Sequence, residues 1–203
     1  MSGTEHFDQA AATWDLADRR VLLAHAVAEA ISLRVPLSRE LNALDFGCGT
    51  GLVTLELAPK LGSISGADTS PGMLKTLAGK AEIQGIPVRL MPLDPAGNGE
   101  LGGPYDLIVS SMTMHHVADV PALFRRFAHH LNPDGQVALA DLDEEDGTFH
   151  EDKTGVHHNG FLREQIQSWL AEAGFREIQL ETAAVTAKES RDYSIFLATA
   201  RRG

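Results

Sequence analysis

Glycines and a carboxylate around residue 47 form the most distinctive chemical pattern in this chain. Residues 44–51 read LDFGCGTG, with a glycine at every second position from Gly47 to Gly51. Glycine permits a tight turn, and its missing Cβ allows a ligand to approach the backbone. A short apolar run precedes this turn and helical spacing follows it, so the pattern predicts a strand, a turn and a helix that bind a nucleotide-like ligand.

The spacing of these glycines argues against a dinucleotide site. A dinucleotide fingerprint reads G-x-G-x-x-G/A, whereas here Gly51 comes one residue early and Leu52 stands in the expected place. The carboxylate of Asp45 would repel a pyrophosphate but attract an ammonium or a sulfonium. A NAD(P)-dependent oxidoreductase is therefore the less favoured alternative. We expect Cys48 to offer its backbone amide to the ligand and not its thiol, because acidic neighbours disfavour a thiolate.

Two further acids end the next two predicted strands. Asp68 lies 21 residues after Gly47, where open α/β sheets bind a ribose diol, and Asp94 closes the third strand. Carboxyl ends of parallel strands share the sheet edge at which ligands bind. The sequence therefore predicts three acids around one site.

Histidines provide the candidate general bases. His115 and His116 follow the fourth predicted strand, and His157 and His158 lie at the end of the polar segment 143–159. Imidazole can take up a proton near neutral pH. We take His115, His116 and His158 as candidate catalytic residues, although the first pair could equally satisfy backbone groups of a loop.

The polar segment also contains the residue types of a metal site. His150, His157 and His158 occur among acids that run from Asp141 to Asp152, and imidazole and carboxylate are ordinary ligands of divalent metals. No H-E-x-x-H or comparably spaced pair is present. We therefore expect a solvated acidic loop or lid and no metal.

Strands and helices alternate along the chain in a way that would place these residues on one edge. Parallel strands need crossovers, so this order predicts a parallel sheet with helices on both faces. Asp18 and Asp119 are candidate helix N-caps. The expected strands are 41–46, 63–67, 87–91, 105–111, 135–141, 175–186 and 190–200, the last two forming a hairpin, and the expected helices are 5–12, 18–33, 52–61, 72–84, 121–131 and 161–173.

Composition and charge exclude several classes of partner. Seventeen Lys and Arg against 28 Asp and Glu give a net charge of −11, which repels nucleic acid and anionic lipid surfaces. Apolar runs are too short for a membrane span, no signal peptide is evident, and one cysteine suits a reducing compartment. We expect a cytoplasmic monomer or homodimer without nucleic-acid or membrane partners. Its single domain, 1–203, would comprise a helical cover (1–36), a cofactor-binding core (41–142), a loop or lid (143–160) and a helix with a hairpin (161–200).

Together these marks resemble class I S-adenosylmethionine-dependent methyltransferases of the small-molecule type, similar to methyltransferase domain families 11, 12 and 25. Residues 45–51 match that family's E/D-x-G-x-G-x-G motif, YDLIVS at 105–110 followed by HHV resembles its fourth-strand motif, and LNPDGQ at 131–136 resembles its turn into strand five. The resemblance covers roughly residues 41–200. It assigns Asp68 to the ribose, Met73 to packing on the adenine and Asp94 to the adenine amine.

The resemblance implies a doubly wound, Rossmann-like, seven-stranded sheet of order 3-2-1-4-5-7-6, mostly parallel with the last strand antiparallel, under an N-terminal helical cover. It also implies S-adenosyl-L-methionine as cofactor and S-adenosyl-L-homocysteine as product. Trp14 could face the sulfonium or pin the cover to the sheet. The expected cofactor-binding residues are Trp14, Asp45, Gly47, Cys48, Gly49, Asp68, Thr69, Met73, Leu93, Asp94 and Ser110.

The implied activity is methyl transfer to an unidentified small molecule, with orientation and exclusion of water supplying most of the rate. Methylation of a base or amide nitrogen is disfavoured, because SSMT stands after strand four where an NPPY-like sequence would be expected. The main alternative is a non-catalytic S-adenosylmethionine-binding or interaction protein on the same fold.

Overall fold

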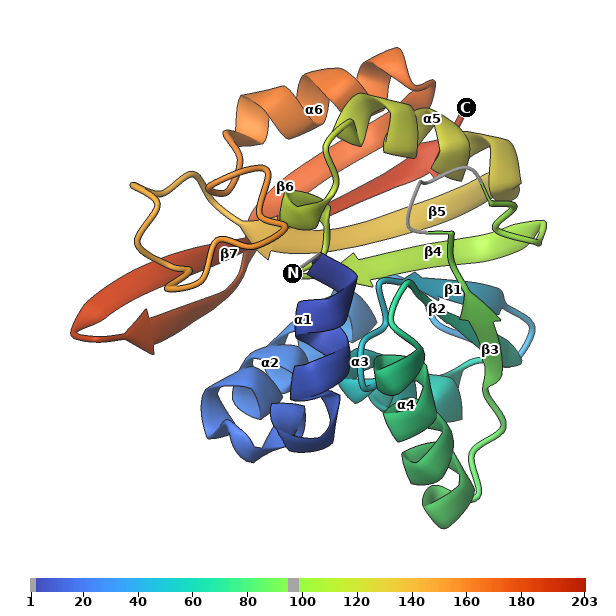
Figure 1. Cartoon of the computed structure of the whole chain (residues 1–203). Coiled ribbons are helices and arrows are strands. Elements are labelled where there is room, and N and C mark those ends of the chain that lie inside the picture. Colours follow the sequence, from blue (N-terminus) through green and yellow to red (C-terminus); the bar gives the residue numbers. More distant parts are fainter. Residues whose placement is uncertain (1–2, 95–98) are drawn as a thin grey trace.

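The computed structural model describes residues 3–94 and 99–203, and its strands form one seven-stranded sheet of order β3-β2-β1-β4-β5-β7-β6 (Figure 1). β7 runs antiparallel to both of its neighbours, and the other pairs are parallel. The predicted fold class, strand order and antiparallel last strand are confirmed. The strands are β1 (Asn42–Phe46), β2 (Ser63–Asp68), β3 (Arg89–Pro92), β4 (Tyr105–Ser111), β5 (Leu131–Leu142), β6 (Phe175–Lys188) and β7 (Arg191–Arg202).

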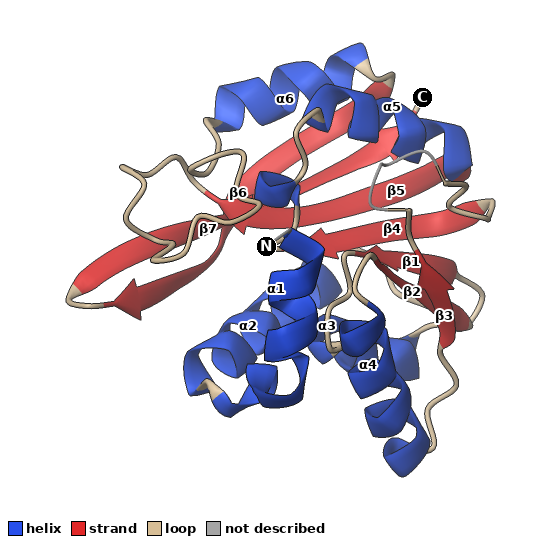
Figure 2. Ribbon diagram, in the orientation of Figure 1, coloured by secondary structure: helices blue, strands red, loops and turns tan. Residues whose placement is uncertain are grey.

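Helices cover both faces of this sheet (Figure 2). One face carries α2 (Asp18–Arg34), α3 (Leu52–Leu57) and α4 (Pro71–Gln84), and the other carries α5 (Val120–His130) and α6 (Arg163–Glu172). Side chains of the central strands alternate between the two layers: Ala43 packs with the α2 cluster, and Leu44 with the α5 cluster. The central strands are therefore apolar on both faces.

The N-terminal segment forms α1 (Gly3–Ala10) and a 3₁₀ helix, η1 (Ala11–Leu16), which pack beside α4. The predicted cover thus has more helical pieces than the periodicity indicated. Its first two residues, and 95–98 of the predicted core, lie outside the described residues. Within the described part of the chain, no helix is long and apolar enough to cross a membrane.

Several predicted element ends need correction. Asp18 is the first residue of α2 and not its N-cap, a position held by Ala17 without a side-chain bond. Asp119 does cap α5, because its carboxylate accepts the Ala122 amide hydrogen at 2.9 Å. The helix predicted over 52–61 is α helical only to Leu57, since Pro59 has no amide hydrogen to continue the ladder and the chain tightens into a 3₁₀ turn, η2 (Ala58–Lys60).

Candidate functional site

A cavity of about 510 Å³ opens at the carboxyl ends of β1, β2 and β4, where the N-terminal helices close over the sheet edge. Most of the predicted site residues line it. The lining residues among them are Trp14, Asp45, Gly47, Cys48, Gly49, Asp68, Thr69, Met73, Leu93, His115 and His116.

Three predicted site residues do not line this cavity. The Ser110 hydroxyl is buried and donates to the Phe46 carbonyl oxygen at 2.8 Å. Asp94 follows the lining residue Leu93 but is not itself among the lining residues. Nε2 of His158 lies 3.0 Å from the Val117 carbonyl oxygen, because the 143–160 loop folds back onto η3 (Met114–His116).

The turn between β1 and α3 needs glycine at two positions. Gly47 has φ +71°, and a Cβ there would meet Thr113 at 2.2 Å. Gly51 has φ +81°, and a Cβ there would meet Leu77 Cδ1 at the same distance. Both positions combine a left-handed backbone with close packing, which only glycine accommodates.

The expectation for Cys48 was wrong. Its backbone amide donates to the Ala67 carbonyl oxygen at 3.0 Å and is not directed to a ligand. The thiol packs with Leu55 and Leu77, and burial raises its pKa well above the ordinary value. Cys48 therefore acts as a small apolar side chain in the wall of the cavity.

Asp68 closes β2 and organises the turn opposite it. One carboxylate oxygen accepts the Gly49 amide hydrogen at 2.8 Å and the other accepts that of Ser70 at 2.9 Å. Burial raises its pKa, and these amides oppose the rise. Each oxygen retains a lone pair, so the group can still accept hydrogen bonds from two hydroxyls.

Asp45 is 1% exposed, and its carboxylate accepts the Thr54 hydroxyl at 2.6 Å. Complete burial raises its pKa to about 7, the Thr54 bond opposes this and the charge of Asp68 adds to it. A cation bound beside Asp45 would lower that pKa again. The site therefore suits a ligand with a positive group.

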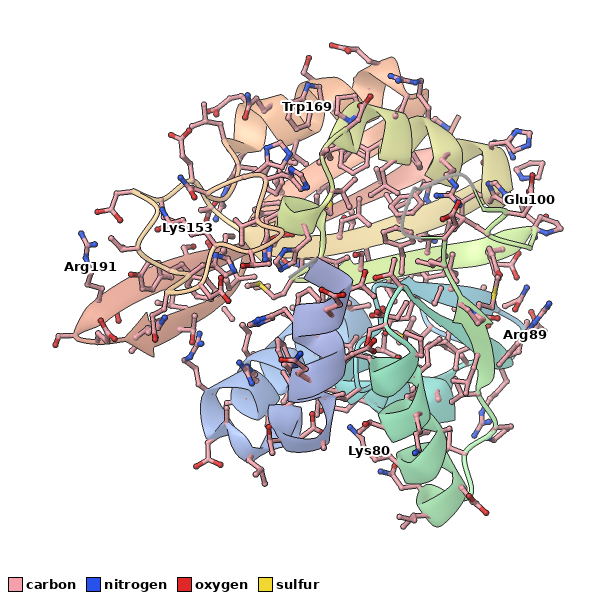
Figure 3. The ribbon with its side chains drawn as sticks, viewed as in Figure 1. Lys80, Arg89, Glu100, Lys153, Trp169 and Arg191 are labelled. Carbon is pink, nitrogen blue, oxygen red and sulfur yellow. The ribbon has the colours of Figure 1, made fainter. Side chains whose placement is uncertain are left out.

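Two aspartates fasten the N-terminal helices over the cavity. Asp8 accepts the Ser70 hydroxyl at 2.5 Å and the Gly72 amide hydrogen at 2.8 Å, at the start of α4. Asp15 accepts the Thr50 hydroxyl at 2.6 Å and pairs with the Lys80 ammonium at 2.7 Å; Figure 3 labels Lys80 on α4. The cover is thus tied both to the glycine turn and to α4.

Aromatic side chains of the cover form its inner surface. The Arg20 guanidinium stacks 3.7 Å from the centroid of Trp14, and Phe7 meets Trp14 and His116 edge-on at 5.6 and 5.1 Å. Trp14 therefore both lines the cavity and holds the cover together.

His115 is fixed by Asp141, which the sequence pattern groups with the acids of the polar segment. Its Nδ1 lies 2.6 Å from Asp141 Oδ1, and both side chains are buried. Burial would raise the pKa of Asp141, but the charge and hydrogen bond of His115 and two backbone amides lower it. Asp141 lies at the end of the buried strand β5, and that strand-end position is the signal that could have revealed it.

A third imidazole joins His115 and His116. His150, on the 143–160 loop, lies with its ring centroid 4.8 Å from that of His115 and 5.8 Å from that of His116. Burial, followed by the charge of His115, lowers the pKa of both His116 and His150 to about 4, so both are neutral at pH 7. The sequence alone groups His150 with His157 and His158, since the approach of His150 to His115 depends on the path of the loop.

Comparison with known proteins places this site in a family. The model of a methyltransferase domain matches residues 16–180. An uncharacterized methyltransferase of Schizosaccharomyces pombe is 31% identical over 73% of this chain and 56% of its own length. The ubiquinone biosynthesis O-methyltransferase of Azorhizobium caulinodans is 32% identical over 61% of this chain and 48% of its own length. The chain thus spans about half of these relatives.

A solved structure shares the fold. The magnesium protoporphyrin IX methyltransferase of Synechocystis, crystallised with bound S-adenosylmethionine, superposes with a TM-score of 0.68 at 20% identity, over 93% of this chain and 82% of that one.

Proposed function

The chain belongs to the class I S-adenosylmethionine-dependent methyltransferases, and from that premise we propose that it methylates a small molecule in the cavity between the sheet edge and the N-terminal cover. The observation that carries the proposal is the convergence of Asp45, the glycine turn and Asp68 on one cavity. Each element suits a different part of the cofactor. The Asp45 carboxylate suits the ammonium group, the glycine backbone leaves room for the aliphatic part of the methionine moiety, and the Asp68 carboxylate suits the ribose diol.

The apolar lining supports the adenine end of this arrangement. Met73 and Leu93 line the same cavity as Asp68 and offer apolar contacts to a flat base. Trp14 and Phe7 of the N-terminal cover also line this cavity. An aromatic face there would stabilise a sulfonium by cation–π attraction.

The volume of the cavity and the net charge of the chain favour a small acceptor. A cavity of about 510 Å³ falls within the range of small-molecule sites. A net charge of −11 disfavours a nucleic-acid acceptor. Two of the similar proteins are named for ubiquinone biosynthesis and for magnesium protoporphyrin IX. The single-domain organisation, the monomeric or dimeric state and the cytoplasmic location expected from the sequence stay predictions.

Bound S-adenosylmethionine would supply a methyl group already activated on its sulfonium. The protein must then hold the acceptor in line with that methyl group, exclude water and receive the acceptor's proton. His115 and His116 lie beside the cavity for the last task, and the Asp141 carboxylate orients the His115 ring.

Calorimetric titration with S-adenosylhomocysteine tests the cofactor site. We expect saturable binding by the wild type and at least tenfold weaker binding by Asp68→Asn, because a hydrogen bond to a charged group contributes about 1.5–3 kcal/mol. Asp192→Asn, on the exposed hairpin, is the matched control and should bind as the wild type does. Circular dichroism would verify that each variant is folded. Absence of binding at millimolar ligand, or unchanged binding by Asp68→Asn, would contradict the proposal.

Turnover separates the enzyme from a non-catalytic binder. Transfer of the methyl group to any of a panel of small phenols, quinones, acids and amines would establish catalysis. Thermal stabilisation by NAD(P) in place of S-adenosylhomocysteine would instead favour the oxidoreductase alternative.

A further inference from the structure

Three imidazoles converge at the side of the cavity nearest η3. One ring nitrogen from each of His115, His116 and His150 lies within 4.8 Å of the others. Three histidines with an open fourth position are a familiar ligand set of catalytic zinc. No sequence motif of a metal site marks them, since two are adjacent in sequence and the third comes from a loop 34 residues later.

Hydrogen bonds at Nδ1 of His115 and of His116 fix the orientation of these two rings and so the position of each Nε2. Nδ1 of His115 lies 2.6 Å from Asp141 Oδ1, and Nδ1 of His116 lies 2.8 Å from the Gly155 carbonyl oxygen. Both partners are acceptors, so each Nδ1 carries a hydrogen, and Nε2 of each ring is the nitrogen left to bind a metal. A carboxylate or carbonyl behind a histidine is the usual outer support of a metal ligand.

His150 is the ring whose polar atoms are least satisfied. Its Nδ1 is buried and has no hydrogen-bond partner among the described residues. Buried polar atoms are nearly always paired, so an unpaired one calls for a missing partner. A cation held between the three rings would provide it.

We propose that His115, His116 and His150 bind one divalent transition-metal ion of the zinc class, with Asp141 as a positioning residue behind His115. Nitrogens bound to zinc at about 2.0–2.1 Å lie about 3.3 Å apart in a tetrahedral site. The three nitrogens, now within 4.8 Å of one another, would move closer together on binding the metal. The fourth coordination position would face the cavity, which His115, His116 and His150 all line.

The charges around the three histidines are partly compensated. Lys188 and Arg19 also line the cavity and would repel a cation. The Lys188 ammonium, however, pairs with the Glu151 carboxylate at 2.8 Å, and the Arg19 guanidinium lies over the Phe149 ring. The net charge of −11 favours a cation over the molecule as a whole.

The metal would also restrict the acceptor, and this part rests on the proposed function. An acceptor with an O–H or S–H group could occupy the open position and release its proton to solvent, because a bound metal lowers the pKa of its ligands. The freed electron pair would form the new bond to the methyl carbon, and the pair of the broken methyl–sulfur bond would stay on sulfur. The imidazoles would then hold the metal, which takes over from them the task of removing the acceptor's proton.

Metal binding can be measured without turnover on the 203-residue chain after a chelator has removed any bound metal. Zinc titrated in competition with a chromophoric chelator should bind at one equivalent, and cobalt should give the strong visible absorption of a tetrahedral site. We expect His150→Ala to weaken zinc binding at least tenfold, and Asp141→Asn to weaken it about 10–100-fold. His25→Ala, an exposed histidine paired with Glu56, should bind zinc as the wild type does.

Three results would overturn the metal site: no stoichiometric zinc binding by the wild type, equal binding by His150→Ala and His25→Ala, or a cobalt spectrum that His150→Ala leaves unchanged. His150→Gln provides a second variant if the alanine variant does not fold. Titration of the same metal-free samples with S-adenosylhomocysteine keeps the two proposals apart. If the wild type binds S-adenosylhomocysteine but not zinc, only the metal site is overturned. If it does not bind S-adenosylhomocysteine, the proposed function is overturned.

Discussion

Asp45 and Asp68 are both strand-end carboxylates, but their surroundings give them different roles. Asp68 accepts two backbone amide hydrogens, whereas Asp45 is buried with one hydroxyl partner. Burial raises the pKa of Asp45 to about 7. Asp68 thus organises the turn, and Asp45 is the carboxylate whose protonation would change with the charge of a ligand.

Ligand binding should therefore depend on pH through Asp45. In the free protein this group binds a proton below pH 7, and a ligand ammonium beside it lowers its pKa, so binding releases a proton. Affinity for S-adenosylhomocysteine should rise about tenfold from pH 6 to pH 8 and level off above that. Calorimetry in two buffers of different ionisation enthalpy would detect the released proton. Asp45→Asn keeps the shape of the side chain and should remove the pH dependence; a slope that survives in this variant would assign it to another group.

The turn between β1 and α3 is the element on which the cavity depends. Gly49 and Gly51 both have positive φ, but their surroundings differ. A Cβ at Gly49 would meet no atom within 4 Å, whereas one at Gly51 would meet the buried side chain of Leu77. Backbone strain is thus common to both positions, and overpacking is confined to Gly51.

Alanine substitutions at Gly49 and Gly51 should separate the cost of backbone strain from the cost of overpacking. Gly49→Ala should destabilise the fold by about 1–2 kcal/mol, the cost of a left-handed backbone. Gly51→Ala should add about 1–3 kcal/mol more, because Leu77 cannot move without disturbing the core. Urea unfolding followed by circular dichroism would measure both. Equal destabilisation of the two variants would show that Leu77 yields freely.

Over the whole molecule, the cavity exists because a segment that precedes the sheet in sequence returns to cover its carboxyl edge. The buried core lies between the sheet and its helices, and α1 contributes no buried residue to it. Polar links from Asp8 and Asp15 hold the cover in place. The cover and the core can therefore be weakened independently.

Asp15→Ala should release the cover while leaving the core intact. We expect several-fold weaker binding of S-adenosylhomocysteine and faster hydrogen exchange over residues 3–16. The free energy of unfolding should change by no more than about 0.5 kcal/mol, as for a surface site outside the core. Glu29→Ala, an exposed acid on α2, is the control and should change neither quantity. Unchanged exchange over 3–16 in Asp15→Ala would contradict this role for the Asp15 links.

Local pattern predicted the alternation of strands and helices and the sheet edge that carries the cavity, and the family resemblance added the order of the strands. Alternating strands and helices, the glycine turn and the strand-end position of Asp68 are short-range signals, because parallel strands carry their carboxyl ends to one edge whatever the loops do. Pairings between distant residues had no such signal. The Cys48 amide donates to the Ala67 carbonyl oxygen of the neighbouring strand, and the Asp141 carboxylate of β5 pairs with His115. His150 contacts both η3 histidines only because the 143–160 loop folds back. These contacts depend on packing between segments far apart in sequence, and tertiary structure alone decided them.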